Sequence, residues 1–306
     1  MLDTANAITK MMSAMANKFT DIFSICWGKF HRQRYKIKND SRSIWIAMTK
    51  LPAYICIMFS FFKTKPTLSE IIPEGSVDIH SHILPGLDDG SKNVDQSIAL
   101  IQGMNNLGFT ELIATPHTMT GVWENSSEGI EKSWKTLQEH ENENAPLRYA
   151  SEYLLDNSFL ERMQKAPLLC LKDRMVLVEL SYFQAPINLF EILFELQLKG
   201  YIPVLAHPER YTYYFSDFKM LEKLKNAGCL FQLNLMSVVG HYGSESLKMS
   251  ESLLNAKLID YVGSDIHHQG HLECFDRKVQ VKNLKALEKA TAANAFFSQE
   301  APLPSP

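Results

Sequence analysis

The sequence predicts an α/β fold in which a parallel sheet closes into a barrel. Short apolar runs alternate with amphipathic stretches from about residue 75 to residue 290, which is the pattern of repeated βα units. About seven such runs suit a closed barrel. An open doubly wound sheet is the alternative, and it is less favoured because no G-x-G-x-x-G motif follows the first run.

The apolar runs are the expected strands, and the stretches between them are the expected helices. The strands are Val77–Ile83, Glu111–Thr115, Arg148–Leu154, Met175–Leu180, Ile202–Ala206, Leu230–Asn234 and Ile259–Gly263. Apolar residues recur at three- and four-residue spacing in the segments 94–107 and 218–227, which indicates amphipathic helices. The segment 189–198 is apolar on nearly every side, so we expect a well-covered helix there. A last helix is expected over residues 283–297.

Glycines support these boundaries, because a glycine can adopt the left-handed conformation that ends a helix. Gly108, Gly200 and Gly228 each stand between an expected helix and the next expected strand.

Composition narrows the class of protein. The chain has 306 residues, of which 45% are hydrophobic and 21% charged, so it can bury a core. Its net charge of -3 gives no electrostatic reason to expect a nucleic acid partner. The five cysteines are odd in number and contain no C-x-x-C pair, which predicts free, mostly buried thiols in a reducing, cytoplasmic compartment.

Residues 1–57 differ in character from the rest. A basic stretch is followed by an apolar run from Ile44 to Phe62, which Lys50 and Pro52 interrupt. Two interpretations remain open: translation that starts at Met58, or a weakly membrane-associated segment. We expect a barrel domain over residues 58–298 and a disordered, proline-rich tail over 299–306. Membrane association is expected only through the substrate or through the N-terminal segment.

Polar residues interrupt the expected strands at nearly the same place each time, the C-terminal end. They are His80, His82, His117, Glu152, Glu179, His207, Asp265 and His267. In a parallel barrel these side chains converge on one mouth. Each alone is more often a core or surface residue, as we expect for His31 and His140, but burying several carboxylates together without cations would cost too much. Mixed imidazole and carboxylate ligands suit Zn, Mn or Fe. The pattern therefore predicts a multi-metal hydrolase site, with phosphate esters as the favoured substrates.

Six segments carry a resemblance to a known family. They read VDIHSHILPGLDDG (77–90), ATPH (114–117), ASEY (150–153), VE (178–179), AHPERY (206–211) and GSDIHH (263–268). Together they resemble the polymerase and histidinol phosphatase (PHP) superfamily, and more closely the tyrosine-protein phosphatases of bacterial capsule and exopolysaccharide operons, the YwqE and CpsB type. The resemblance begins at about Met58 and does not cover residues 1–57.

This resemblance implies a distorted (β/α)7 TIM-like barrel with up to three divalent metal ions, with manganese favoured over iron or zinc. It implies one ion held by His80, His82, Glu152 and Asp265. It implies a second ion that shares Glu152 and adds Glu179 and His207, and a third held by Asp89, His117 and His267. Asp89 enters through the resemblance alone, since Asp88-Asp89-Gly90 looks equally like a turn.

Two further residues are candidates for catalysis by attack of a metal-bound hydroxide. Arg210 is placed to fork onto a phosphate oxygen, or else forms a surface salt bridge with Glu209. His268 is either a proton donor to the leaving phenolate or an exposed residue. Related sequences often carry a second arginine after the last motif. Here His271 or Arg277 would have to substitute for it.

The resemblance implies a protein-tyrosine phosphatase that acts on a phosphotyrosine protein, the tail of a bacterial tyrosine kinase of exopolysaccharide or capsule biosynthesis. One alternative is a small-molecule phosphatase such as a histidinol-phosphate phosphatase. Another is an inactive metal-bearing regulatory or binding module, which the missing second arginine favours. A metal-dependent amidohydrolase is less favoured, because Glu152 stands where a bridging lysine would be expected.

Overall fold

The computed structural model describes residues 65–140 and 146–299, which belong to one compact unit of the chain. The expected N-terminal extension over residues 1–57 lies outside the described residues, as does the expected tail beyond Gln299. No helix in the described ranges is long and apolar enough to cross a membrane.

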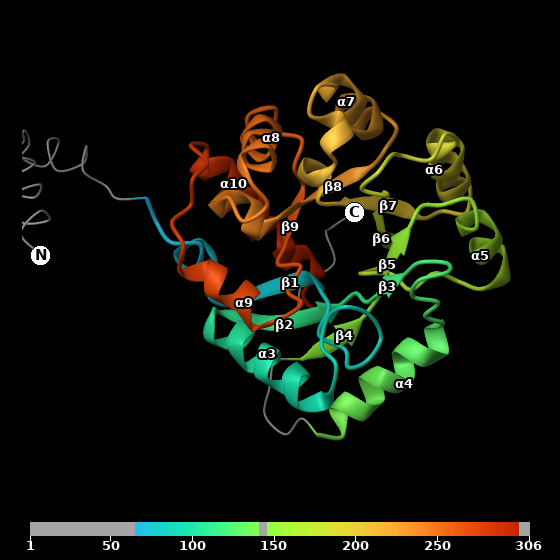
Figure 1. The fold of residues 1–306 in the computed structure, drawn as a ribbon, viewed down its shortest axis with the longest axis horizontal. Coiled ribbons are helices and arrows are strands. Elements are labelled where there is room, and N and C mark those ends of the chain that lie inside the picture. Colours follow the sequence, from blue (N-terminus) through green and yellow to red (C-terminus); the bar gives the residue numbers. More distant parts are fainter. Residues whose placement is uncertain (1–64, 141–145, 300–306) are drawn as a thin grey trace, which may run out of the picture. The chain divides into compact units, whose positions relative to one another are not determined.

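The strands are all parallel and form two sheets that follow one another around a ring (Figure 1). The first sheet has the order β1-β2-β4, with bounds Ser76–Ser81, Phe109–Ala114 and Leu147–Tyr149. The second has the order β3-β5-β6-β7-β8-β9, with bounds His117–Thr118, Glu152–Leu154, Met175–Glu179, Ile202–Ala206, Leu230–Asn234 and Tyr261–Gly263.

The ring closes where β1 meets the residues that follow β9. Ser81 forms a parallel bridge with Ile266. The amide of Asp265 donates to the carbonyl of His80 (2.7 Å), and the amide of His82 donates to the carbonyl of Ile266 (2.8 Å). The structure therefore confirms the expected α/β barrel.

One expected strand, Arg148–Leu154, is interrupted, and the structure corrects this prediction. β4 ends at Tyr149 and β5 begins at Glu152, and β2 and β3 are separated in the same way by Thr115 and Pro116. Pro116 has no amide hydrogen, so the ladder cannot run through it without a break. Its carbonyl instead accepts a hydrogen bond from the amide of Glu152 (3.1 Å). This bond lies where the two neighbouring strand lines pass from the first sheet to the second. Since β2 with β3 and β4 with β5 each trace one line, the ring has seven strand lines and is distorted at this point.

Helices surround the strands on the outside of the ring (Figure 1). They are α3 Val94–Asn106, α4 Ser127–Gln138, α5 Phe159–Lys165, α6 Leu189–Leu198, α7 Phe218–Asn226, α8 Ser244–Asn255, α9 Gln269–Leu272 and α10 Leu284–Ala293. The expected helices over 94–107, 218–227 and 283–297 are confirmed, the last as α10 followed by a 3-10 turn, Asn294–Phe297. Gly108 and Gly228 have φ values of +99° and +89°, as a helix-ending glycine requires.

For the segment 189–198, the expectation of a helix is confirmed, but the expectation that the helix is well covered is wrong. Its inner residues such as Ile192 and Leu196 are buried against the barrel. However, Phe190, Phe194 and Leu198 on its outer face are exposed. A helix of the outer ring has one face on the sheet and the other turned outward, so an apolar outer face stays uncovered.

The expectation of free thiols is confirmed for the cysteines that the structure describes. Cys229 and Cys274 are buried, Cys170 is partly buried, and none of the three forms a disulfide. Cys26 and Cys56 lie outside the described residues.

Candidate metal centre

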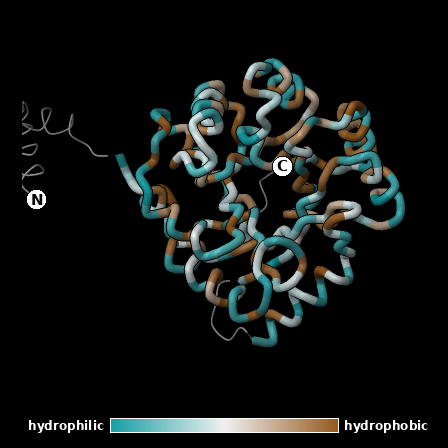
Figure 2. The backbone as a smooth tube through the Cα atoms, viewed as in Figure 1, coloured by the Kyte–Doolittle hydropathy of each residue, from teal (hydrophilic) through white to brown (hydrophobic). Residues whose placement is uncertain are grey.

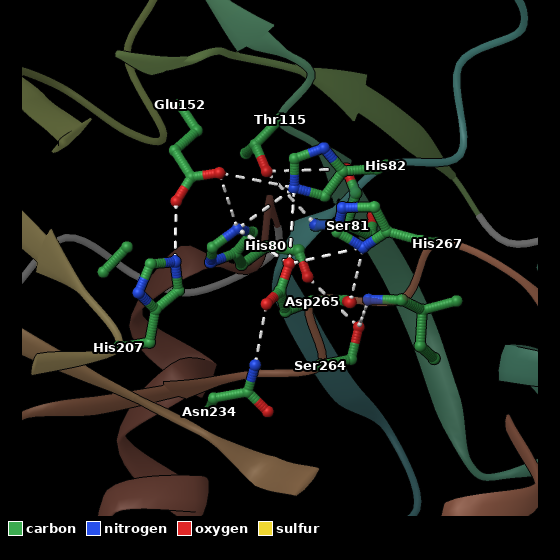
Figure 3. A network of polar contacts seen from close by, with 12 residues as sticks. His80, Ser81, His82, Thr115, Glu152, His207, Asn234, Ser264, Asp265 and His267 are labelled. Carbon is green, nitrogen blue, oxygen red and sulfur yellow. Dashed lines mark hydrogen bonds and ion pairs between the residues drawn. The ribbon is translucent and has the colours of Figure 1, made fainter. Parts of the chain in front are cut away.

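The nine expected metal ligands come together at the C-terminal ends of the strands. Figure 3 shows His80, His82, Glu152, His207, Asp265 and His267 of this set. The nine residues are His80 and His82 at the end of β1, Asp89 in the loop after it, His117 on β3, Glu152 on β5, Glu179 on β6, His207 after β7, and Asp265 and His267 after β9. All are buried except Asp89, which is more than half exposed, and His267, which is partly exposed. The barrel thus gathers residues from distant parts of the chain into one largely buried cluster.

The first strand presents two imidazoles as a pair of lone-pair donors. The side-chain amide of Gln232 donates to the carbonyl of Leu233, so its oxygen faces His80 and accepts from Nδ1 (2.7 Å). The carboxylate of Asp88 accepts from His82 Nδ1 (2.8 Å). Both Nε2 atoms therefore carry lone pairs when the rings are neutral, and they lie 3.2 Å apart. Two lone pairs that face the same point suit a cation that both nitrogens bind.

Glu152 lies at the centre of the cluster. Its Oε2 atom lies 3.2 Å from His80 Nε2, 3.4 Å from His82 Nε2 and 3.1 Å from His117 Nδ1. Its Oε1 atom lies 3.0 Å from His207 Nε2. A carboxylate with imidazoles on both oxygens is placed as a bridging ligand between cations would be.

Several buried atoms of the cluster lack hydrogen-bond partners among the described residues. They are His117 Nδ1, Glu152 Oε2, Glu179 Oε1 and His207 Nδ1. His117 Nδ1 is 3.1 Å from both Glu152 Oε2 and Glu179 Oε1, so these atoms are close without the geometry of a hydrogen bond. Buried polar atoms are normally paired. Atoms that converge on shared space instead of on one another fit the expected metal ions.

The ligand atoms fall into four overlapping groups, within each of which all atoms lie within 4.8 Å of one another. The groups are His82, Asp89, His117 and His267; His80, His207 and Asp265; His80, His82 and Glu152; and His117, Glu152 and Glu179. This grouping keeps the expected set of Asp89, His117 and His267 together, but it separates Glu179 from His207. How the nine residues are divided among ions therefore stays a prediction. Their donor chemistry suits Zn, Mn or Fe.

Two ligands are held in a strained backbone conformation. His207 has a φ of +35° and Asp265 a φ of +53°, in the left-handed region that non-glycine residues seldom adopt. Such residues cost about 1–3 kcal/mol each and persist where their surroundings impose them. The amide of His207 donates to the carbonyl of Gln232 (2.8 Å), and that of Asp265 donates to His80. The positions of both side chains are thus imposed by neighbouring strands.

Charge in the cluster is balanced by protons when no metal is bound. Burial opposes the charge on His117, but the carboxylates of Glu152 and Glu179 outweigh it and raise its pKa to about 10. Burial also disfavours the charge of Glu152, yet His80 and His117 hold its pKa well below the ordinary value. His207 is different, because burial and the Arg210 guanidinium lower its pKa to about 4. Metal ions that enter the cluster would replace protons on the imidazoles, so binding releases protons.

Two supporting residues were missed in the sequence. Asp88, expected at most to form a turn, accepts from His82 Nδ1, from the amide of His117 (2.9 Å) and from the amide of Gly90 (2.9 Å). Gln232 fixes His80 from within β8. The signal for Gln232 was present, since it is a polar residue inside an apolar strand. Position 90 requires a glycine, because a Cβ there would lie 2.0 Å from the His82 carbonyl oxygen.

Arg210 ends a short 3-10 turn, Pro208–Arg210, directly beside the cluster. Its Nη1 donates to Asp265 Oδ2 (2.6 Å). Its guanidinium lies 4.0 Å from the ring centre of Tyr242 and 5.1 Å from that of Tyr182. Glu209, the alternative partner from the sequence, is buried on another side and accepts from the Ser237 hydroxyl (2.7 Å). The surface salt bridge with Glu209 is therefore wrong, and the arginine is held at the mouth.

At the rim, beyond the expected ligands, side chains make fewer contacts that fix their positions. His268 is exposed, and its ring lies 4.0 Å from that of His271. Burial, with His268 and His267 nearby, lowers the pKa of His271 to about 3, so this ring is neutral. A neutral imidazole cannot supply the charge of an arginine. Arg277 is exposed.

Comparisons with known proteins relate the chain to one family. Residues 76–294 match the family model described as "Capsular polysaccharide synthesis, CpsB/CapC". Tyrosine-protein phosphatase YwqE of Bacillus subtilis is 30% identical over 230 residues, which cover 74% of this chain and 87% of that protein. Tyrosine-protein phosphatase CpsB of Streptococcus pneumoniae is 29% identical over 201 residues, which cover 63% of this chain and 83% of that protein.

A solved structure extends this likeness to the fold. It belongs to a study of YwqE from Bacillus subtilis and CpsB from Streptococcus pneumoniae, which are described as unique metal-dependent tyrosine phosphatases. The match has a TM-score of 0.61 at 30% identity and covers 73% of this chain and 88% of the other.

Proposed function

We propose that this chain, which belongs to the CpsB/CapC family of capsular polysaccharide synthesis, is a metal-dependent phosphatase that hydrolyses phosphotyrosine in proteins. The observation that carries the proposal is the buried cluster around Glu152, whose unpartnered atoms converge as metal ligands do. The tyrosine-protein phosphatases YwqE and CpsB, to which the chain is similar, supply the reaction. All nine expected ligands take part, with Arg210 as a phosphate-binding residue beside them.

The metal ions, Arg210 and His268 have separate roles in hydrolysis. When bound, the ions supply positive charge near the phosphoryl group and acidify a water molecule, so that hydroxide is available near neutral pH. Arg210 donates to a phosphoryl oxygen in a geometry that Asp265 holds from one side and the rings of Tyr182 and Tyr242 from the faces. His268 is the candidate proton donor to the leaving phenolate.

Aromatic residues at the mouth support an aromatic ester as substrate. The ring of Trp123 stacks on His117 at 4.8 Å and an interplanar angle of 11°. The ring of Tyr182 lies over His207 at 5.9 Å and 18°. Both rings are partly exposed, so a phenyl ring that enters the mouth meets apolar faces beside the ligands.

The finer assignments form part of the same proposal. Manganese is the favoured ion, with iron or zinc as alternatives, since the donor set suits all three. The protein acts in the cytoplasm, on the phosphotyrosine tail of a bacterial tyrosine kinase of capsule or exopolysaccharide biosynthesis. The family's link to capsular polysaccharide synthesis supports this partner.

The test compares substrates under controlled metal loading. The full chain is stripped with a chelator and reloaded with manganese, iron or zinc, and hydrolysis is measured on phosphotyrosine peptide, phosphoserine peptide and histidinol phosphate. We expect turnover of the phosphotyrosine peptide that is lost on stripping and restored on reloading. A preference for histidinol phosphate would replace the proposal with a small-molecule phosphatase. Absence of turnover with every ion and substrate would leave a metal-bearing regulatory module.

A further inference from the structure

Exposed apolar side chains are concentrated on one segment of the described chain. Of the large apolar residues that the described ranges expose, all but Val122 lie between positions 182 and 202. They are Tyr182, Phe183, Ile187, Phe190, Phe194, Leu198 and Ile202. Tyr182 belongs to the mouth. Phe190, Phe194 and Leu198 lie on α6, which is on the outside of the ring (Figure 1).

The outer face of α6 differs from that of its neighbour α7. Along α7, Lys219, Glu222 and Lys223 are exposed, as expected of a surface helix. On α6 much of the tube in Figure 2 is brown, because apolar residues lie on the outer as well as the inner face, with Glu191 and Glu195 between them. Monomeric soluble proteins rarely leave such a continuous apolar patch in water.

We propose that α6 is the interface through which two copies of this chain associate, with the two helices packed antiparallel. The α6 stripe, as we define it, consists of Ile187, Phe190, Phe194 and Leu198. Positions spaced by three or four residues share one face of a helix, so Phe190, Phe194 and Leu198 form a single row. Ile187 stands just before the helix begins, whereas Ile202 opens β7 after the chain has turned at Gly200 and is not part of the stripe.

The α6 stripe is self-complementary, as a twofold interface requires. Phe194 stands in the middle, with Phe190 four positions before it and Leu198 four positions after it. Antiparallel packing about Phe194 places Phe194 on Phe194 of the second copy and Phe190 on its Leu198. Each exposed apolar residue of the helix itself thus meets an apolar partner, and a parallel arrangement is not needed to cover any of them.

Charges beside the stripe favour the same arrangement. Glu191 is exposed on α6, and Lys199 is exposed directly after it, where its ammonium donates to the Met163 carbonyl (3.0 Å). In the antiparallel pair, each Glu191 lies at nearly the same level as Lys199 of the second copy, within about two residues or 3 Å along the axis. Two opposite-charge contacts therefore flank the apolar row, one on each side of the twofold axis.

The area suffices for a stable pair. Phe190 and Phe194 expose 43% and 58% of their surface, and Ile187 and Leu198 expose 104% and 64%, together roughly 500 Å². A stable complex buries roughly 800 Å² per partner, of which somewhat more than half is apolar, so the stripe supplies the apolar part of such an interface.

The geometry also keeps both sites open. α6 follows β6, so it begins near the mouth and runs away from it. Antiparallel helices then place the two mouths at opposite ends of the pair, where each admits substrate independently. Association is therefore separable from turnover.

The experiment measures the mass of the full chain in solution by size-exclusion chromatography with light scattering. We expect the wild type to show twice the 34.9 kDa of one chain, and Phe194→Glu to show the mass of one chain with its activity on p-nitrophenyl phosphate unchanged. Val122→Glu is the matched control, because Val122 is 62% exposed and Phe194 is 58% exposed, but only Phe194 lies on the stripe. This control should remain a dimer.

Cysteine cross-linking tests the direction of the helices, with the wild type under the same oxidant as background. Phe194→Cys should form a cross-linked dimer, because residue 194 meets itself. Phe190→Cys alone should not, whereas Phe190→Cys combined with Leu198→Cys should.

Three outcomes would overturn the proposal: a monomeric wild type at every concentration, a Phe194→Glu variant that stays dimeric, or efficient cross-linking of Phe190→Cys alone. A monomeric wild type in which Phe194→Glu weakens turnover of a phosphotyrosine peptide but not of p-nitrophenyl phosphate would assign the stripe to substrate docking instead.

Discussion

At the centre of the mouth, His80, His82 and Glu152 are fully buried, and each contacts several partners. At the rim of the same mouth, His268 and Arg277 are exposed. Both regions lie on barrel strands or on the segments that directly follow them, so they share a scaffold and differ in the number of contacts that fix each side chain. Arg210 lies between the two, since it is largely buried but carries one firm ion pair.

This difference in the number of contacts shows for which residues the geometry indicates a function. A candidate ligand such as Asp265 is fixed by a strained backbone and by hydrogen bonds from Asn234 and Arg210, so its position is over-determined. A rim residue without such restraints can be placed by the substrate. We therefore expect substitutions to have effects that decrease from the centre outward.

Removal of a central ligand should have the largest effect. Asp265→Ala should lower metal content and reduce phosphatase activity by about three orders of magnitude or more, because several kcal/mol of charge stabilisation are lost. Metal content is measured by elemental analysis and activity with a phosphotyrosine peptide. Asp217→Ala, at an exposed position on the outside of the barrel, is the control. Full activity in Asp265→Ala would refute a metal centre at this position.

Arg210 should come next, with an effect on turnover alone. Arg210→Ala should lower kcat by about 10²–10³-fold, since a preorganised donor to the phosphoryl group is removed. Arg210→Lys keeps the charge but loses the planar fork, so it should recover only part of the activity. Metal content should stay at the wild-type level in both variants. A parallel loss of metal would show that Arg210 acts by positioning Asp265.

Asp88→Asn should weaken metal binding by about 10–100-fold, as loss of a carboxylate partner of a ligand histidine does. The physical reason is that Asp88 fixes the tautomer of His82 through Nδ1. Calorimetric titration with manganese measures the affinity. At saturating metal, kcat should return close to the wild-type value. A kcat that stays low would place Asp88 in the reaction itself.

The metal-free protein should lose stability as pH rises. The pKa of His117 is raised to about 10 from an ordinary value of 6.5, because Glu152 and Glu179 outweigh the effect of burial. A raised histidine pKa gives stability that is complete below pH 6.5 and disappears as pH rises toward 10. The thermal midpoint in chelator should therefore fall by several degrees over this range. His117→Asn should flatten the curve, and an unchanged slope would contradict this account.

His268→Ala should have the smallest effect. Its ring is exposed, so few contacts fix it, and we expect a loss of about tenfold in kcat together with a shift of the alkaline limb of the pH–rate profile, because the proton donor to the leaving phenolate is removed. A kcat within about twofold of the wild type would show that the phenolate takes its proton from water.

Much of the fold follows from local patterns. The seven apolar runs occur as strand lines, and Gly108 and Gly228 end helices with positive φ as expected. The break in the strand over 148–154 was not predicted. It depends on how Pro116, a residue of the adjacent strand line, meets Glu152, and no window of sequence contains both.

Likewise, the candidate ligands were found from their place at strand ends, but their supports were not. Gln232 reaches His80 across 152 positions of sequence, and only the closed ring brings them together. The apolar outer face of α6 shows the same limit. Its composition predicted burial, whereas its place in the outer ring decided exposure.

The residue types at the strand ends by themselves determined that imidazoles and carboxylates gather at one mouth, because parallel strands in a barrel bring their C-terminal ends together wherever the helices lie. Only the tertiary structure decided which oxygen meets which nitrogen, that Arg210 pairs with Asp265 and not with Glu209, and which face of α6 is left uncovered. The reason is physical. Local periodicity indicates where each strand and helix lies along the chain and which of its faces is apolar. Contacts between side chains depend on distances across the closed barrel.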